Sequence, residues 1–210
     1  MQACGDENVL VVVDVQRDFC SGGALAIEDG DAVVEPVNRS MDRFRHVVLT
    51  QDWHPPDHRS FATQHAGRQA YDVVEMAYGP QVLWPVHCVA GSPGAEFHPE
   101  LRVDRAQLIV RKGFRAGIDS YSAFRENDRR TVTGLTGYLR ERGFKRVFLA
   151  GLAYDYCVGY SALDALELGF EAWVVVDACR SVGLAGSVAR MDRMVEQAGV
   201  GRVTVSELAG

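Results

Sequence analysis

Short runs of aliphatic residues alternate with longer amphipathic stretches along most of this 210-residue chain. Runs such as residues 9–13 (VLVVV) and 173–176 (WVVV) carry no charged side chain, which is typical of strands buried on both faces of a parallel sheet. The alternation therefore predicts a single-domain α/β fold, doubly wound and Rossmann-like, with helices on both faces of a six-stranded parallel sheet. The predicted strands are residues 9–13, 47–50, 108–111, 147–150, 172–176 and 203–205.

Helical periodicity is found at about residues 32–45, 130–142 and 187–197, and in the stretch that follows Asp155. A chain of this length suffices for one well-buried domain, so we expect residues 1–210 to form a single domain. Residues 52–107 form a long stretch that is rich in proline, glycine and histidine. Because long irregular segments in compact domains are usually functional, this segment is expected to contribute to a site.

Charge and composition restrict the classes of partner. The net charge of −6 gives no electrostatic footprint for nucleic acid, and no apolar run approaches the roughly 20 residues of a membrane span. Residues 1–7 (MQACGDE) lack the basic-then-apolar order of a signal peptide, so the protein is expected in the cytoplasm with reduced thiols. The five cysteines form no CxxC pair, which argues against a disulfide framework or a zinc ribbon. A small molecule is therefore the expected partner.

Four ionisable residues lie where the first, second, third and fourth of the main predicted strands end: Asp14, Asp52, Lys112 and Cys157. Ligands bind at the carboxyl ends of the strands in such sheets, so these side chains are expected to converge at one edge. Each residue taken alone could instead be a cap, a turn residue, a solvated strand end or a packed thiol. Their joint occurrence favours a site.

Cys157 follows a strand at the point where a helix should begin. Asp155 is a favourable N-cap residue for that helix, which places Cys157 in the first turn. The unpaired N–H groups and partial positive charge of a helix N-terminus favour a thiolate, and they could also hold an oxyanion. Cys157 is therefore a candidate nucleophile, although free cysteines are also among the most often buried residues.

Asp52 and His54 are two residues apart at a strand end and can both face one metal ion. A third ligand must come from elsewhere, and the candidates in this region are His58, His65, His87 and His98. His87 is favoured because its apolar neighbours would bury it, and a buried imidazole needs a partner. One carboxylate and two imidazoles suit Zn²⁺, Fe²⁺ or Mn²⁺, and the alternative is a set of loop histidines that only form hydrogen bonds.

Five motifs occur in a characteristic order. They are residues 12–25 (VVDVQRDFCSGGAL), 51–62 (QDWHPPDHRSFA), 84–89 (WPVHCV), 111–113 (RKG) and 151–158 (GLAYDYCV). Together with residues 97–99 (FHP) and 176–179 (VDAC), they closely resemble the nicotinamidase (pyrazinamidase) branch of the isochorismatase-like cysteine hydrolases. The resemblance covers about residues 9–205. It implies hydrolysis of nicotinamide to nicotinate and ammonia, and of pyrazinamide to pyrazinoate, through a thioester acyl-enzyme.

The resemblance implies a role for each residue of the catalytic site. The implied catalytic triad is Cys157, Asp14 and Lys112. A cis peptide bond is implied before Ala153, and the backbone N–H groups of Ala153 and Cys157 would form the oxyanion hole. The aromatic side chains implied in the ring pocket are those of Phe19, Trp84 and Tyr121.

The resemblance also implies one divalent metal ion, held by Asp52, His54 and His87 and binding the pyridine nitrogen of the substrate. Zn²⁺ is the first choice, with Fe²⁺ or Mn²⁺ as alternatives, and relatives differ in whether the histidine at His58 ligates. The biological task is either NAD salvage or amide detoxification. Whether the protein forms a homo-oligomer stays open.

One residue departs from the family pattern. Tyr154 stands where the family usually has threonine, which leaves the shape of the pocket beside Cys157 open. Two other functions are weighed: a hydrolase of the same superfamily acting on carbamoyl, ureido or vinyl ether substrates, and a metal-dependent thiol sensor or binding module. The full metal trio argues against the first function, and Lys112 with Asp14 argues against the second.

Overall fold

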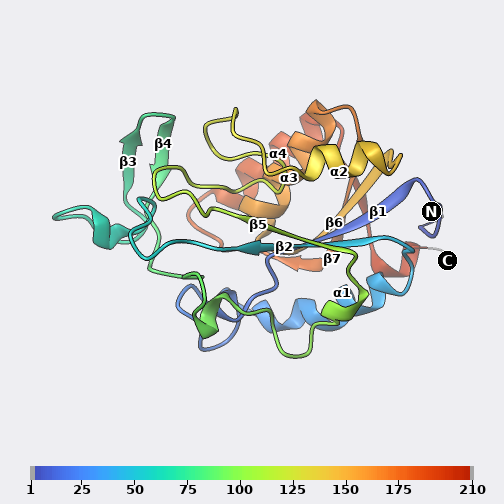
Figure 1. Cartoon of the computed structure of the whole chain (residues 1–210), viewed down its shortest axis with the longest axis horizontal. Helices are drawn as coiled ribbons and strands as arrows, with labels where there is room; N and C mark the ends of the chain where they lie inside the picture. Colours follow the sequence, from blue (N-terminus) through green and yellow to red (C-terminus); the bar gives the residue numbers. More distant parts are fainter. Residues whose placement is uncertain (1–2, 209–210) are drawn as a thin grey trace.

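A parallel sheet forms the centre of the computed structural model, which describes residues 3–208 (Figure 1). Its strands are β1 (Asn8–Val13), β2 (Val47–Asp52), β5 (Leu108–Lys112), β6 (Arg146–Leu152), β7 (Glu171–Arg180) and β8 (Gly201–Val203). Within residues 3–208 this sheet has six strands, in the order β5-β2-β1-β6-β7-β8, and every pairing is parallel. The predicted fold class is confirmed.

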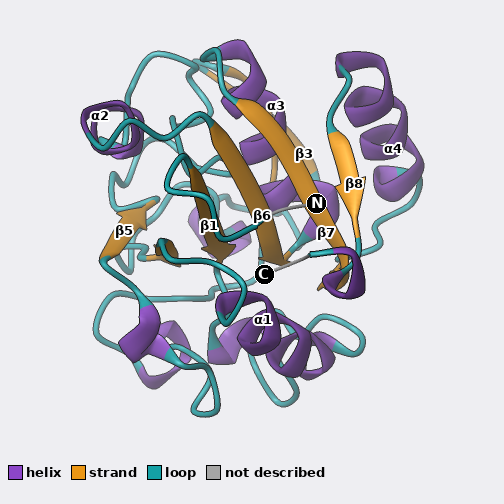
Figure 2. Ribbon diagram, turned by 90° about the vertical axis from the view of Figure 1, so that its right-hand side faces the viewer, coloured by secondary structure: helices purple, strands orange, loops and turns teal. Residues whose placement is uncertain are grey.

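Helices cover both faces of the sheet. They are α1 (Val34–Met41), α2 (Leu135–Glu141), α3 (Gly159–Glu167) and α4 (Ser187–Ala198). In Figures 1 and 2, α1 lies below the sheet and the other three lie above it. Val34, Val37 and Met41 of α1 are buried at spacings of one helical turn, so one face of this helix packs inward. Among the described residues, no helix combines the length and apolarity needed to cross a membrane.

The strand order brings the carboxyl ends of β5, β2, β1 and β6 side by side. Asp52 is paired in register with Lys112 across β2 and β5, and Val13 with Gly151 across β1 and β6. β1 and β6 lie in the middle of the sheet, and every residue of β1 is buried. Asp14 directly follows β1, so it too reaches the edge at which the other strands end.

Some element boundaries differ from the sequence-based predictions. β7 continues to Arg180 instead of ending at residue 176. The strand predicted at 203–205 is misplaced, because β8 ends at Val203 and a 3₁₀ turn follows at Val205–Glu207. Residues 52–107 contain an antiparallel hairpin of β3 (Val73–Met76) and β4 (Gly79–Val82). Both hairpin strands are short and partly exposed, so they produce no aliphatic run in the sequence.

The prediction that Asp155 caps the helix after β6 is wrong. Ala153 is the N-cap, and Asp155 lies inside the π-helical turn Tyr154–Val158 that leads into α3. The Asp155 carboxylate accepts hydrogen bonds from the backbone N–H groups of Val182 and Gly183 and from the Ser187 hydroxyl. Asp155 therefore fixes the segment that precedes α4, and its oxygens are not available to the start of α3.

Candidate active site

The amino group of Lys112 lies at the centre of the carboxyl edge of the sheet. Lys112 Nζ is 2.8 Å from Asp14 Oδ2, 2.7 Å from Asp52 Oδ1 and 3.5 Å from Cys157 Sγ. It also donates a hydrogen bond to the carbonyl oxygen of Ser120 at 2.9 Å. All of these side chains are buried. The structure thus brings together the four residues that the sequence predicts at this edge.

Asp14 has a fixed orientation at the end of β1. Its φ angle of 49° lies in the left-handed region, which is uncommon for a residue other than glycine and recurs at functional sites. The Thr50 hydroxyl donates to Asp14 Oδ1 at 2.6 Å and accepts a hydrogen bond from the Asp14 backbone N–H at 3.2 Å. One carboxylate oxygen is therefore occupied by Thr50, and the other faces Lys112.

Burial controls the ionisation of the candidate nucleophile. Burial raises the pKa of the Cys157 thiol well above its usual value, although the Lys112 cation opposes this effect. The pKa of Asp14 is also raised, by burial and by the Asp52 carboxylate, again against the effect of Lys112. Although burial favours a neutral amine, Asp14 and Asp52 raise the pKa of Lys112 well above its usual range. Burial therefore opposes the thiolate that a helix N-terminus was expected to favour, and Asp14 is the carboxylate that lies beside Lys112 and Cys157.

Cys157 lies in the turn Tyr154–Val158, shortly after a cis peptide bond between Leu152 and Ala153. The cis peptide implied by the family resemblance is thus present. Ala153 and Cys157, the two residues expected to supply the oxyanion hole, both line the same pocket. The Ser161 hydroxyl donates to the carbonyl oxygen of Cys157 and accepts the backbone N–H of Ala123 at 2.8 Å, which ties the turn to a neighbouring segment.

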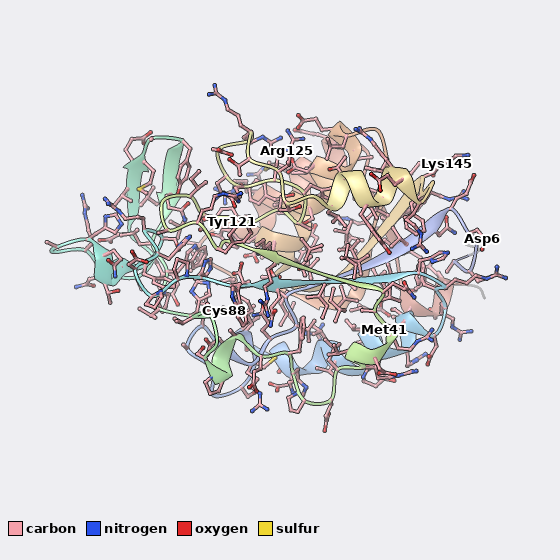
Figure 3. The ribbon with its side chains drawn as sticks, viewed as in Figure 1. Asp6, Met41, Cys88, Tyr121, Arg125 and Lys145 are labelled. Atoms are coloured by element: carbon pink, nitrogen blue, oxygen red, sulfur yellow. The ribbon has the colours of Figure 1, made fainter. Side chains whose placement is uncertain are left out.

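The pocket beside Cys157 is a partly open hollow of about 360 Å³, a volume that includes solvent at its mouth. Phe19, Trp84 and Tyr121 line it, as the resemblance implies. Tyr156, which the sequence did not single out, meets Trp84 edge-on with 4.9 Å between ring centroids. Tyr121 is labelled in Figure 3, in the half of the molecule that carries the β3–β4 hairpin. Aromatic walls of this kind suit a flat ring as the ligand.

Asp52, His54 and His87 form a buried group whose ligand atoms lie within 4.8 Å of one another. Asp52 Oδ2 is 3.2 Å from His54 Nε2 and 3.6 Å from His87 Nε2. The Nδ1 atom of each histidine lies 2.8 Å from a backbone carbonyl oxygen, that of Gly113 or Pro85. Each Nδ1 therefore donates its proton, and each Nε2 is directed at Asp52.

The electrostatics of this trio fit a divalent metal ion. His54 Nε2 is buried and faces Asp52 Oδ2 at 3.2 Å without a well-aligned hydrogen bond, an arrangement that a shared metal ion would satisfy. Although burial opposes ionisation, Lys112 and His54 hold the pKa of Asp52 well below its usual range. Gly113 permits the arrangement, because its φ is +67° and a Cβ there would lie 2.5 Å from His54 Cε1. One anionic carboxylate and two imidazole nitrogens are a common donor set for zinc and iron.

His58 lies beside this trio, in a second group with His54 and Asp119. His58 Nδ1 is 2.7 Å from the Ser60 hydroxyl, and its Nε2 is 3.2 Å from the Ile118 carbonyl oxygen. Burial and the neighbouring His54 lower the pKa of His58 to about 4. His58 is therefore a neutral imidazole with partners of its own, close to the metal-ligand candidates.

Asp119 lines the pocket and was missed from the sequence. It is buried, and its Oδ2 accepts a hydrogen bond from Gln81 Nε2 at 2.7 Å. Asp119 lies at no strand end and in none of the sequence motifs, so no local sequence signal marks it. Only its place between the hairpin and the histidines shows that it belongs to the site.

The remaining histidine candidates lie elsewhere. His65 Nε2 bonds to the carbonyl oxygen of Arg59 at 2.8 Å, and His98 Nε2 is 3.3 Å from Asp31 Oδ1. Neither residue is in the Asp52 group. Of the four histidines weighed as the third ligand, His87 is the one that joins Asp52 and His54, in agreement with the prediction from its apolar flanks.

Tyr154 points away from the pocket. Its hydroxyl donates to Asp192 Oδ1 at 2.7 Å and accepts a hydrogen bond from Arg202 at 3.0 Å. Its side chain lines a different cavity, together with Asp192 and Arg202. The departure from the family pattern therefore leaves the pocket shape beside Cys157 unaffected.

Comparisons with known proteins identify the family of the chain. The model of the isochorismatase domain matches residues 8–207. The nicotinamidase of Acinetobacter baylyi is 48% identical over 195 residues, which cover 93% of this chain and 91% of that protein. The solved nicotinamidase and pyrazinamidase of Acinetobacter baumanii superposes with a TM-score of 0.96 at 50% identity, covering 98% of this chain and 99% of that one. The pyrazinamidase of Pyrococcus horikoshii, solved in complex with zinc, gives a TM-score of 0.76 at 35% identity, with coverages of 94% and 99%.

Proposed function

The chain belongs to the isochorismatase family, and we propose that it hydrolyses nicotinamide to nicotinate and ammonia, and pyrazinamide to pyrazinoate in the same way. The observation that carries this proposal is the position of Lys112 Nζ, in contact with Asp14, Asp52 and Cys157 beside an aromatic pocket. Relatives named for this activity, at 48% and 50% identity, support it. We further propose that residues 1–210 form one isochorismatase-like hydrolase domain.

Cys157 is the proposed nucleophile. Its sulfur bonds to the carboxamide carbon while the thiol proton passes to Asp14, and the carbonyl electron pair moves onto the oxygen. The N–H groups of Ala153 and Cys157 receive this oxyanion, and each such donor typically lowers the barrier by about 3 kcal/mol. The C–N bond then breaks as Asp14 returns the proton to the leaving nitrogen. Ammonia departs, and a thioester remains.

Asp14 acts again in the second half of the reaction. Water attacks the thioester carbon as its proton passes to Asp14, the C–S bond breaks, and the sulfur recovers the proton when nicotinate leaves. The raised pKa of Asp14 suits a group that must both accept and donate a proton near neutral pH. Lys112 is within contact distance of both partners, so its role is to hold them in register and to balance the carboxylate charges.

For the metal we propose one divalent ion held by Asp52, His54 and His87, with zinc as the first choice and iron or manganese as alternatives. The buried His54 Nε2, which faces Asp52 Oδ2 without a well-aligned hydrogen bond, supports the site, and the zinc in the Pyrococcus horikoshii pyrazinamidase supports the choice of ion. When bound, the ion would offer an open coordination position to the pyridine nitrogen. Phe19, Trp84 and Tyr121 would enclose the ring and orient the carboxamide toward Cys157.

The activity places the protein in NAD salvage. The five cysteines are all free, which supports a reducing compartment such as the cytoplasm.

Ammonia release tests the function directly. The purified protein should release ammonia from nicotinamide and pyrazinamide, and far less from a ureido substrate such as an N-carbamoyl amino acid. Benzamide keeps the carboxamide and the ring size but lacks the ring nitrogen. Because sites built for a polar atom can reject analogues lacking it by up to about 10⁴-fold, kcat/KM for benzamide should be at least about a hundredfold lower. A faster reaction with the ureido substrate would assign the chain to another reaction of the family.

A further inference from the structure

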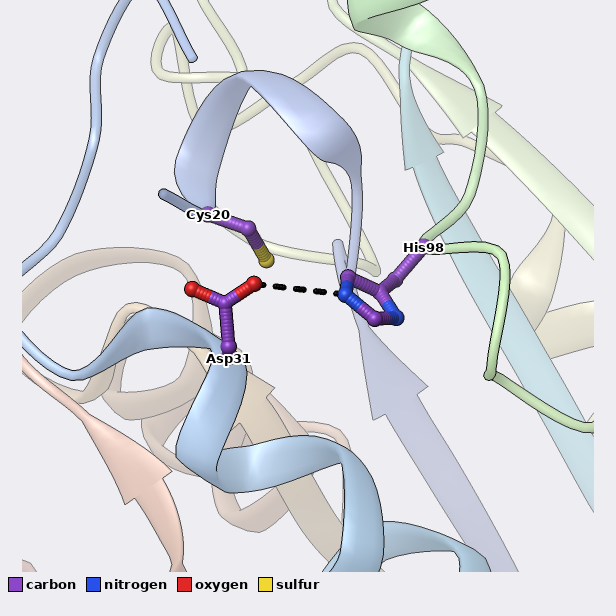
Figure 4. Close-up of side chains that lie close together, drawn as sticks. All are labelled: Cys20, Asp31 and His98. Carbon is purple, nitrogen blue, oxygen red and sulfur yellow. Dashed lines mark ion pairs between the residues drawn. The ribbon is translucent and has the colours of Figure 1, made fainter. Parts of the chain in front are cut away.

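Cys20, Asp31 and His98 meet outside the candidate active site (Figure 4). Cys20 follows the 3₁₀ turn Arg17–Phe19, Asp31 lies in the 3₁₀ turn Gly30–Val33, and His98 lies in the long segment before β5. The thiol sulfur, a carboxylate oxygen and an imidazole nitrogen all lie within 4.8 Å of one another. Three separate segments thus bring three different metal-binding groups to one place.

Hydrogen bonds hold this group in position. The backbone N–H of His98 donates to the Val15 carbonyl oxygen at 2.9 Å. Asp31 Oδ2 accepts the backbone N–H of Ser21 at 2.8 Å and also the Ser21 hydroxyl, which leaves Oδ1 facing His98 Nε2 at 3.3 Å. In Figure 4 the sulfur of Cys20 points toward the space between the carboxylate and the ring. The three donor groups are therefore already oriented toward a common point.

The group is distinct from the proposed catalytic metal site. It shares no residue with Asp52, His54 and His87, and it lines a separate, open surface cavity. Cys20 is buried, whereas the Asp31 side chain is 42% exposed. Solvent can therefore reach one side of the group and supply a further ligand.

We propose that Cys20, Asp31 and His98 form a second metal site, which binds zinc through three protein ligands and one water molecule. Zinc takes thiolate, imidazole and carboxylate ligands in a tetrahedron, with ligand atoms about 3.5 Å apart. Donor atoms already within 4.8 Å of one another reach this geometry by small side-chain movements. On binding, a bond forms between Cys20 Sγ and the ion as the thiol proton leaves to solvent.

An ordinary hydrogen bond from His98 Nε2 to Asp31 is the competing explanation. His98 Nδ1 accepts a long hydrogen bond of 3.2 Å from the Glu100 backbone N–H, so without metal the proton on Nε2 faces Asp31. Metal binding at Nε2 moves that proton to Nδ1 and breaks the Glu100 contact. A hydrogen bond between His98 and Asp31, however, does not account for the thiol. Thiolate is the soft ligand that distinguishes zinc and cobalt sites from those of magnesium or calcium.

Cobalt titration tests the proposal, because a thiolate ligand gives Co²⁺ an intense near-ultraviolet charge-transfer band that carboxylate and imidazole ligands do not. Metal-stripped wild-type protein is titrated with Co²⁺, and absorption and bound metal are measured. We expect two equivalents per chain, one of which produces the thiolate band. Zinc added afterwards should remove the band by displacing cobalt.

Matched variants assign each equivalent to its site. Cys20→Ser should lose the thiolate band and retain one equivalent, whereas His54→Ala should retain the band and lose the other equivalent. Cys157→Ser and Cys4→Ser should keep the band, because neither thiol belongs to this group. His98→Ala should weaken cobalt binding at the band-producing site at least tenfold, and it serves as the second variant if Cys20→Ser fails to fold.

The proposal does not depend on the proposed hydrolase function, since every readout is a metal-binding measurement. Folded wild-type protein that shows no thiolate band at saturating cobalt overturns it. A band that survives in Cys20→Ser and disappears in Cys157→Ser also overturns it, and assigns the thiolate to the active site.

Discussion

Lys112 connects the side chains of the candidate site through its amino group. It is fully buried between the carboxylates of Asp14 and Asp52, and it also reaches the sulfur of Cys157. One buried cation thus connects the proposed proton carrier, the proposed nucleophile and a metal-ligand candidate. Substitutions at this position and at Cys157 should therefore separate chemistry from stability.

Cys157→Ala should reduce ammonia release from nicotinamide to the background rate and leave the fold intact, because a methyl group replaces the thiol at a buried position. Cys179→Ala is the matched control: this thiol is also buried, at the end of β7, and lies outside the pocket. It should retain activity within about tenfold, apart from any loss of stability. Steady-state kinetics with circular dichroism checks both variants, and a substantial rate in Cys157→Ala would falsify the nucleophile assignment.

Lys112→Met should lose activity by orders of magnitude and also lower the free energy of unfolding. Methionine has a similar length but no charge, so two buried carboxylates are left without their cation, which typically costs about 3–5 kcal/mol. Denaturant unfolding and ammonia release measure the two effects.

The double variant Asp14→Asn/Lys112→Met is the control for Lys112. It should recover part of the lost stability, since one of the two buried charges is gone, and it should stay inactive. If Lys112→Met is inactive but as stable as the wild type, the charge-balancing role of Lys112 is wrong.

At the scale of elements, the β3–β4 hairpin supports the pocket through Gln81. This fully buried side chain donates to Asp119 Oδ2 at 2.7 Å and to the Tyr121 hydroxyl at 3.1 Å, and its carbonyl oxygen accepts a hydrogen bond from Asn127 at 3.2 Å. The hairpin is therefore connected to two pocket residues from a different segment. The hairpin itself does not line the ring pocket, so its contribution is to hold the lining residues Asp119 and Tyr121 in place.

Gln81→Leu should raise KM for nicotinamide at least about tenfold, with a smaller change in kcat, because Tyr121 and Asp119 lose the group that orients them. The buried Asp119 also loses a donor, which costs about 1–3 kcal/mol of stability. Glu75→Gln, an exposed change on the same hairpin, is the control and should behave like the wild type. A drop in kcat with KM unchanged would contradict a role in shaping the pocket.

At the scale of the whole molecule, the proposed catalytic metal would connect β2 to the long segment that contains His87. An ion that binds only the folded state at about a thousand times its Kd adds about 4 kcal/mol of stability. For a chain of this size, each kcal/mol changes Tm by roughly 2–4 °C. Chelation should therefore lower Tm by about 8–16 °C and remove activity on nicotinamide.

His87→Ala separates this effect from metal bound elsewhere. In this variant the part of the Tm increase that belongs to the catalytic site should be absent, and Cys20→Ser should still show it. Differential scanning fluorimetry with defined zinc additions makes the comparison. Wild-type activity in fully metal-free protein would leave the triad in place but remove the metal from the proposed function.

The sequence by itself determined the sheet, because aliphatic runs at strand length are a local property that burial on both faces requires. It also determined which residues stand at strand ends, so that Asp14, Asp52 and Lys112 could be placed at one edge before any coordinates were known. The choice of His87 as the third metal-ligand candidate followed from its apolar neighbours. Each of these inferences rests on residues close together in the chain.

Only the tertiary structure decided features that depend on distant segments. Asp119 and Gln81 meet through a hairpin without an aliphatic run, and the side chain of Tyr154 is directed by Asp192 and Arg202. The pKa of the Cys157 thiol is raised because desolvation by many surrounding residues outweighs the nearby cation, which no local spacing encodes. Burial and long-range contacts depend on segments from the whole fold, so only the tertiary structure determines them.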